Sequence, residues 1–421
     1  MPQTNVFCVS IILLSMGCNG NKEEEISNGS NGCVDTEYEG SFLCDAWLYN
    51  TSGKKSAVLQ EDGAGILTDI AYTTLSTEDD VDYLIIETSG VPSYEWKADQ
   101  SDVDWLNNRP NASTDFVDGE TLAQVGVTYS FGADIGYRSS TDCDTGAGYG
   151  WWPPGPMCPS NQYKSVALPL NPQPQASGSR CETGLGALGI FVNGVSVYNW
   201  SDGASYSNQN VWYNVAAKYE VYDLGPCNGH AANGDYHHHN LSSCLMEAVG
   251  ETGSGHSDIY GFAADGYPIY GPYVSSGVEA QSCWVARDYT NPNDPYGCGG
   301  TGDRTCLMVD PFQPELGTEN ASQSGPSTNE IVTSMSGNNF TATSGFYKED
   351  YYYNTDCTDQ GLAYLDEFNG HDHDDLGYHY HITATYPYFT GPLLYGVVHS
   401  NNSTSCDGVS GMGPGGPGGP Q

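Results

Sequence analysis

Basic residues are scarce in this 421-residue sequence. Lys and Arg together number 12 against 52 Asp and Glu, which gives a formal net charge of −40 at pH 7. A chain with so few cations cannot present the basic surface that neutralises phosphates, so the composition argues against nucleic-acid binding. It also argues against docking on anionic lipids through charge. The acidic excess is typical of a secreted protein that repulsion keeps in solution.

Motifs of the common enzyme classes are missing as well. The sequence has no Gly-x-Ser-x-Gly nucleophile elbow, no His-Glu-x-x-His helix and no phosphate-binding loop. It also has no Cys-x-x-Cys pair, which argues against zinc-finger and redox sites. Any catalytic or binding chemistry must therefore come from another pattern.

No apolar run approaches the roughly 20 residues that cross a bilayer. Residues 6–17 instead have the length of a signal-peptide hydrophobic region, although Met1–Asn5 before them carries no Lys or Arg. Gly17-Cys18 follows and resembles the lipobox of bacterial lipoproteins, with Leu14 one place further from the cysteine than in that pattern. We therefore expect a lipid on Cys18, with an ordinary signal peptide as the alternative.

The composition divides the chain into four segments. We expect a signal peptide at 1–18, a polar tether at 19–45, one β-rich domain at 46–400 and a tail rich in Gly and Pro at 401–421. This organisation predicts an extracytoplasmic protein, either a cell-surface or periplasmic lipoprotein or a secreted protein.

The cysteines support export. Of 14 cysteines, Cys8 lies in the predicted signal peptide and Cys18 at the predicted lipid site, which leaves an even number spread along the chain. Scattered, even-numbered cysteines in an exported protein predict disulfides, although the connectivity does not follow from the sequence. Plausible local bridges are Cys33/Cys44, Cys143/Cys158 and Cys227/Cys244.

Short apolar runs bounded by Gly, Asn, Asp and Pro dominate the sequence, and none forms a convincing amphipathic helix. Residues 83–88 predict a strand. Asn-Gly within Gly189–Tyr198 and Asp-Gly within Gly261–Tyr270 predict hairpins, the second with Pro268 at a sheet edge or a bulge. The fold class we expect is all-β or β-rich: a disulfide-bonded, hairpin-containing, sandwich-like domain with long loops.

Nine of the ten histidines lie between positions 230 and 381. An Asn-Gly-His sequence ends at His230 and again at His371. Each copy is followed, after a short polar loop, by Tyr-His-x-His, at residues 236–239 and 378–381. The shared pattern indicates an internal duplication.

Strand geometry gives this duplication a chemical meaning. Side chains at positions i and i+2 of a strand point to one face, so His237 can converge with His239, and His379 with His381. The histidine of each Asn-Gly-His could add a third imidazole, and His256 could complete either site. The predicted metal ligands are therefore His230, His237, His239, His256, His371, His379 and His381.

Neutral imidazoles suit copper or zinc, and we expect copper ahead of zinc as the bound metal ion. Nearby aspartates, among them Asp235 and Asp366, are expected to accept hydrogen bonds that fix the imidazole tautomers. His238, His373 and His399, taken singly, are expected to be structural or surface residues. A hydrogen-bonded ladder of histidines and tyrosines without metal is the alternative for the whole set.

Several segments resemble the bacterial YHYH domain family. Gly377–His381 resembles its signature, and residues 365–370 resemble its Leu-Asp-Glu-Cys-Asn-Gly segment, with Phe368 in place of the cysteine. Asp265–Gly271 and the earlier histidine motif also fit, so that the resemblance covers roughly residues 80–395. It implies an exported protein with one integrated domain. The family has no settled activity, so the resemblance supplies no reaction.

The sequence thus predicts an exported protein that binds metal through duplicated His-x-His motifs. One alternative is a metal-dependent oxidoreductase or hydrolase at the same site, and another is a metal-free surface or adhesion domain. The predicted partners are a metal ion and, through the lipid on Cys18 alone, a membrane. No protein partner is predicted.

Overall fold

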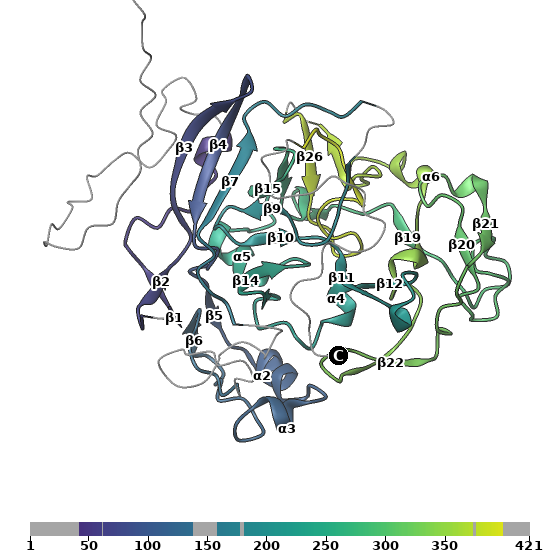
Figure 1. Ribbon diagram of the computed structural model, residues 1–421, viewed down its shortest axis with the longest axis horizontal. Helices are drawn as coiled ribbons and strands as arrows, with labels where there is room; N and C mark the ends of the chain where they lie inside the picture. Colours follow the sequence, from purple (N-terminus) through teal and green to yellow (C-terminus); the bar gives the residue numbers. More distant parts are fainter. Residues whose placement is uncertain (1–41, 61, 138–157, 177–180, 374–375, 399–421) are drawn as a thin grey trace, which may run out of the picture. The chain divides into compact units, whose positions relative to one another are not determined.

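A computed structural model describes residues 42–60, 62–137, 158–176, 181–373 and 376–398 (Figure 1). This part of the chain is β-rich, with several sheets and short helices, as predicted. The helices are α1 (Phe42–Asp45), α2 (Gln100–Asn107), α3 (Ala112–Asp115), α4 (Ala216–Tyr219), α5 (Ser243–Val249) and α6 (Thr355–Thr358), with 3-10 turns η1 (Tyr206–Asn208), η2 (Pro314–Leu316) and η3 (Lys348–Asp350).

The two longest helices escaped prediction because local caps rather than an amphipathic pattern define them. Asp99 and Asp102 form a capping box at the start of α2. The Ser242 side chain accepts a hydrogen bond at the start of α5, and Gly250 ends that helix with a left-handed backbone. Such caps stabilise a helix by about 1 kcal/mol each, which helps a short segment to form without a long apolar stripe.

An eight-stranded sheet forms the centre of the fold. In spatial order it contains β13 (His230–Ala232), β14 (Asp235–His238), β10 (Ser196–Tyr198), β9 (Ala187–Phe191), β15 (Ile259–Ala263), β16 (Pro268–Tyr270), β26 (Tyr378–His381) and β25 (Gly370–Asp372). Both histidine motifs therefore belong to one sheet, towards its two ends.

The strand order in one half of this sheet is repeated in reverse in the other half. In each half, a hairpin (β9–β10 or β15–β16) pairs in parallel with the second strand of a histidine hairpin (β13–β14 or β25–β26). Val197 is in register with His238 in one half, and Ile269 with Tyr380 in the other. The two halves meet where β9 pairs antiparallel with β15. The duplication seen in the histidine motif thus extends to four further strand pairings, two in each half.

Glycines allow the two halves to approach closely at this seam. A Cβ atom on Gly189 would lie 2.4 Å from the Phe262 carbonyl oxygen, and one on Gly261 would lie 2.6 Å from the Ile190 carbonyl oxygen. Real Cβ atoms do not come this close, so any larger residue would force the strands apart.

Pro268 occupies an interior strand rather than the sheet edge that was one expectation for it, and the β15–β16 hairpin that contains it has the irregular register of a bulge. β16 lies between β15 and β26. The proline is the first residue of β16, and the pairing with β26 begins only at Ile269. The ladder therefore needs no hydrogen-bond donor from the proline.

A three-stranded sheet packs with the central sheet around one apolar core. Its strands are β3 (Ile70–Glu78), β4 (Val81–Thr88) and β7 (Lys164–Pro169), and β4 contains the predicted strand. The core cluster includes Leu84 and Ile86 of β4, Ile190 of β9 and Phe262 of β15, each at most 1% exposed. Burial of such side chains stabilises the fold by about 1.5–3 kcal/mol each.

Eight two-stranded sheets complete the described part of the chain. They are β1 (Lys55–Leu59) with β2 (Gly65–Leu67), β5 (Glu95–Lys97) with β6 (Thr128–Ser130), β8 (Cys181–Glu182) with β27 (Leu393–Leu394), β11 (Ser201–Ser205) with β12 (Tyr213–Val215), β17 (Tyr273–Ser275) with β18 (Val278–Glu279), β19 (Trp284–Ala286) with β24 (Tyr351–Tyr353), β20 (Cys306–Met308) with β21 (Thr318–Asn320), and β22 (Ile331–Thr333) with β23 (Asn339–Thr341). Among the described residues, no helix combines the length and apolar character that crossing a membrane requires.

Disulfides link segments of this loop-rich structure. Those with both cysteines in the described ranges are Cys227–Cys244, Cys283–Cys357 and Cys298–Cys306. The prediction of Cys227/Cys244 is confirmed. The other two predicted pairs each include a cysteine, Cys33 or Cys143, outside the described residues, so they stay predictions.

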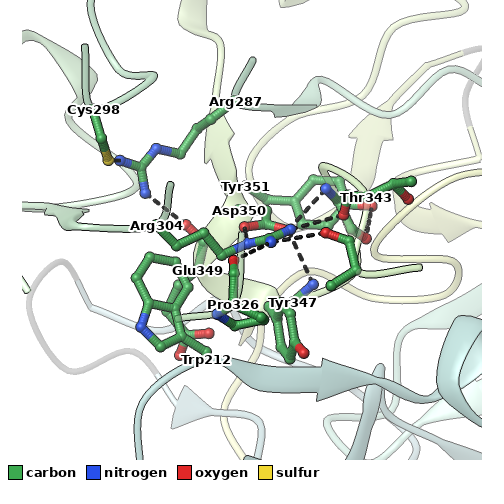
Figure 2. A network of polar contacts seen from close by, with 12 residues as sticks. Trp212, Arg287, Cys298, Arg304, Pro326, Thr343, Tyr347, Glu349, Asp350 and Tyr351 are labelled. Carbon is green, nitrogen blue, oxygen red and sulfur yellow. Dashed lines mark hydrogen bonds and ion pairs between the residues drawn. The ribbon is translucent and has the colours of Figure 1, made fainter. Parts of the chain in front are cut away.

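A buried arginine organises the loops around β20–β24 (Figure 2). Arg304 is fully buried and donates hydrogen bonds to both carboxylate oxygens of Asp350, each at 2.7 Å. It also donates to the backbone carbonyls of Pro326, Ala342 and Thr343. Every N–H group of the Arg304 guanidinium thus has an acceptor. The bidentate pair with Asp350 and the bonds to the carbonyls together hold four separate segments of the chain in place.

Candidate metal centres

Three imidazoles gather at the β13–β14 hairpin, and we call this group centre A. It consists of His230 from β13, His237 from β14 and His239 just after β14, and all three side chains are at most 3% exposed. One nitrogen from each lies within 4.8 Å of the others. The Nε2 atoms of His237 and His239 are 3.1 Å apart.

Backbone carbonyls fix the tautomers in centre A. The Nδ1 atom of His237 lies 2.9 Å from the Asp235 carbonyl oxygen, and that of His239 lies 2.7 Å from the Asn199 carbonyl oxygen. A carbonyl can only accept, so each Nδ1 must carry the proton. In the neutral rings the two Nε2 lone pairs then face each other at 3.1 Å. Lone pairs at this distance repel unless a cation or a proton lies between them.

The carboxylate of Glu220, directly after α4, completes one side of centre A. Its Oε2 atom lies 3.2 Å from His239 Nε2 and 3.4 Å from His230 Nε2. Burial would raise the pKa of Glu220, but the two imidazoles lower it overall. Burial lowers the pKa of His239, but Glu220, the Asn199 carbonyl and Asp202 together outweigh burial, so that the pKa is raised. No motif in the sequence marked Glu220.

The second group of imidazoles, centre B, lies at the β25–β26 hairpin. It consists of His256, His373, His379 and His381, whose ligand nitrogens all lie within 4.8 Å of one another. His379 and His381 are fully buried, whereas His256 and His373 are partly exposed. His371 lies beside them, with its ring centroid 4.5 Å from that of His373 and 4.9 Å from that of His379. His256, which could have completed either site, thus lies in centre B.

The tautomers in centre B are fixed in the same way as in centre A. The Nδ1 atom of His379 lies 2.7 Å from the Gly377 carbonyl oxygen, and that of His381 lies 2.7 Å from the Gly271 carbonyl oxygen. The Nε2 atoms of both rings are buried, and among the described residues they have no hydrogen-bond partner. Both therefore present an unprotonated nitrogen to the middle of the group.

The backbone acceptors are duplicated together with the imidazoles. In each half, the first ring of His-x-His bonds to the carbonyl two residues before it. The second ring bonds to the carbonyl directly after the parallel strand, at Asn199 after β10 and at Gly271 after β16. A ligand geometry that is fixed by the backbone in both copies depends on the fold rather than on neighbouring side chains.

The electrostatics keep the rings of His371, His379 and His381 neutral. Burial, followed by the neighbouring imidazoles, lowers the pKa of His371 to about 3. The same causes lower the pKa of His379 to about 4 and place that of His381 well below its usual value. At neutral pH these rings therefore offer lone pairs rather than positive charge, as metal ligands must.

The single histidines divide between the sites and the core. His373 was expected to be structural, and the structure instead places it in centre B. His238 lies in the core, where its Nε2 is 2.9 Å from the Tyr94 hydroxyl and its Nδ1 is 2.8 Å from the Asn228 carbonyl oxygen. His399 lies outside the described residues.

The expected aspartate acceptors bind other groups. The Asp235 carboxylate pairs with Lys164 and accepts from the Ser196 hydroxyl, and only its backbone carbonyl contacts an imidazole. The Asp366 carboxylate accepts from the Tyr378 hydroxyl. Backbone carbonyls take their place: that of the residue two positions earlier for His237 and His379, and that of the residue after the paired parallel strand for His239 and His381.

Comparison with known proteins identifies the family. The family model described as "YHYH protein" matches residues 165–394, which is more than half of the chain. The chain belongs to the YHYH protein family. The YHYH match contains the whole central sheet, both histidine centres and Glu220. Searches among curated proteins and among solved structures gave no match.

Proposed function

We propose that this YHYH protein is an exported protein that binds transition-metal ions at centres A and B. The observation that carries the proposal is the 3.1 Å approach of two Nε2 atoms whose Nδ1 atoms are both committed to carbonyls. Two ligands of a tetrahedral ion with bonds of about 2.0–2.1 Å lie about 3.3–3.4 Å apart. The separations of Glu220 from His239 and His230, 3.2 and 3.4 Å, lie close to this distance.

The chemistry of the donors supports copper first and zinc second. Imidazole nitrogen suits both ions, and copper(II) lies above zinc in general affinity for nitrogen ligands. Thiolates, which would favour softer ions, do not belong to either centre. The net charge of −40 also concentrates cations near the protein surface.

Export is supported by the covalent chemistry of the chain. Disulfides persist mainly in oxidising compartments outside the cytoplasm. The bridges at Cys227–Cys244, Cys283–Cys357 and Cys298–Cys306 agree with the predicted signal peptide at 1–18. A lipid on Cys18 would then keep the protein at a membrane surface, with the polar residues between Cys18 and α1 as the tether.

Elemental analysis of the natively purified protein tests the proposal. We expect bound copper or zinc in the wild type, less in His237→Ala/His239→Ala, and less in His379→Ala/His381→Ala. His238→Asn is the matched control, because it removes an imidazole between two proposed ligands without removing a ligand, and its metal content should equal that of the wild type. Negligible metal in every protein, also after incubation with copper(II) or zinc, would overturn the proposal and favour a metal-free surface domain.

A further inference from the structure

We propose that the two centres have diverged in their exchange of metal: centre B takes up and releases its ion, whereas centre A retains one. The inference rests on the proposed function, because it assigns different tasks to the same two sites. Both centres share one framework, with the triad His230, His237 and His239 equivalent to His371, His379 and His381 in strand position. The differences that matter therefore lie in what surrounds each triad.

The first difference is the charge of the surrounding groups. In centre A the added donor is the carboxylate of Glu220, which contacts His230 and His239. In centre B the added donors are the imidazoles of His256 and His373, which supply no negative charge. A carboxylate offsets one positive charge of a divalent ion in a buried site, whereas imidazoles leave the full charge in place. Centre A therefore binds a divalent ion more firmly than an all-imidazole site of equal burial.

The second difference is access. Every imidazole of centre A is at most 3% exposed, so a chelator or another protein reaches the ion only past the side chain of Glu220, which is 17% exposed. In centre B, His256, His371 and His373 are all partly exposed. An incoming ligand can reach an ion there while the buried pair His379 and His381 still holds it.

The third difference is the number of ligands. Including His371, centre B contains five imidazoles, with ring centroids 4.5–5.4 Å apart in the pairs that make contact. A four-coordinate copper or zinc ion uses no more than four of them. The surplus ring can replace a departing ligand, so the ion can change partners stepwise and never loses all its ligands at once. Such a ligand surplus lowers the barrier to transfer.

Zinc release to a chelating dye tests this inference. The wild-type protein is loaded with zinc and mixed with an excess of 4-(2-pyridylazo)resorcinol, whose absorbance reports each ion released. We expect two phases of similar amplitude, a fast one from centre B and a slow one from centre A. His379→Ala/His381→Ala should remove the fast phase, and His237→Ala/His239→Ala the slow one.

Glu220→Gln tests the role of the carboxylate with little change of shape. The slow phase should accelerate by about 10–100-fold, as expected when a group that supports a metal site is lost, and the fast phase should stay unchanged. Asp202→Asn is the matched control, because Asp202 is a half-buried neighbouring carboxylate that accepts hydrogen bonds from Asn214 and from the Ala204 amide rather than from an imidazole. Near-ultraviolet circular dichroism of each variant establishes that its fold is intact.

The outcomes separate this inference from the proposed function. Failure of the wild type to bind zinc or copper(II) would overturn the proposed function itself. Two bound ions released in one phase would overturn only the division of tasks. The division also fails if the slow phase disappears in the centre B variant, or if Glu220→Gln and Asp202→Asn accelerate the slow phase equally.

Discussion

Acidification should destabilise the metal-free protein through His238, which lies between two proposed ligands but faces the core. Burial lowers the pKa of this imidazole to about 4. In the unfolded chain its pKa returns to about 6.5. Below pH 6.5 His238 therefore binds a proton in the unfolded chain but not in the folded protein. The stability contribution is complete above pH 6.5 and is lost as the pH falls towards 4.

The size of this effect follows from the two pKa values. When the pH falls from 6.5 to 4.5, His238 takes up its proton only in the unfolded chain. This lowers the free energy of unfolding by about 2 kcal/mol. Carboxyls whose pKa values are raised by partial or full burial act in the opposite direction, because their folded forms hold protons more tightly than the unfolded chain does. These are Asp202, Asp223, Asp265, Glu349 and Asp366, with pKa values of about 6 to 7. The pH dependence of wild-type stability therefore combines destabilising and stabilising contributions.

A comparison with His238→Asn isolates the histidine. The asparagine amide keeps a donor for the Asn228 carbonyl but does not titrate. Urea unfolding in the presence of EDTA, followed by tryptophan fluorescence at pH 6.5 and 4.5, gives the free energy of unfolding of both proteins. From pH 6.5 to 4.5, the free energy of unfolding of the wild type should fall by about 2 kcal/mol more than that of the variant.

Two features of the result check the reasoning. Between pH 7.5 and 8.5 the difference between wild type and His238→Asn should be constant, because the imidazole is neutral in both states. Parallel pH profiles between 6.5 and 4.5 would refute the argument, since they would mean that His238 accepts a proton in the folded protein.

Three further predictions concern stability and use chemical unfolding as the measurement. Replacing Cys283 and Cys357 by Ala should cost about 4 kcal/mol, because their bridge closes a loop with a sequence separation of 74, and an unchanged midpoint would contradict this. Arg304→Met should cost about 3–5 kcal/mol by leaving the Asp350 carboxylate buried without its cation, while the double variant Arg304→Met/Asp350→Leu should cost clearly less. Gly261→Ala should cost about 1–3 kcal/mol, because its Cβ would lie 2.6 Å from a carbonyl oxygen of β9, and a neutral effect would show that the seam can open.

The parts of the site that repeat in the sequence were predictable. Asn-Gly-His and Tyr-His-x-His occur twice, and the two-residue period of a strand was enough to place His237 with His239 and His379 with His381. The turn dipeptides likewise predicted two hairpins of the central sheet, β9–β10 and β15–β16. These features follow from local geometry, which a single sequence carries.

The site residues that come from segments without a repeated motif or a strand period were not predictable. Glu220 ends a four-residue helix and reaches centre A only through the tertiary fold. His373 follows β25 in a loop, where no strand period indicates the direction of its side chain. The carbonyls of Asn199 and Gly271 became acceptors because β10 and β16 pair in parallel with the histidine strands, a pairing that links residues about 40 and 110 positions apart.

The seam between β9 and β15 has a consequence for the origin of the chain. The antiparallel pairing of two equivalent strands is the contact that two identical subunits make across a twofold axis. A polypeptide of one repeat could therefore build the same eight-stranded sheet as a homodimer with two equal metal sites. Joining the copies in one gene would have removed the constraint of symmetry, so that a glutamate could enter one site and additional histidines the other.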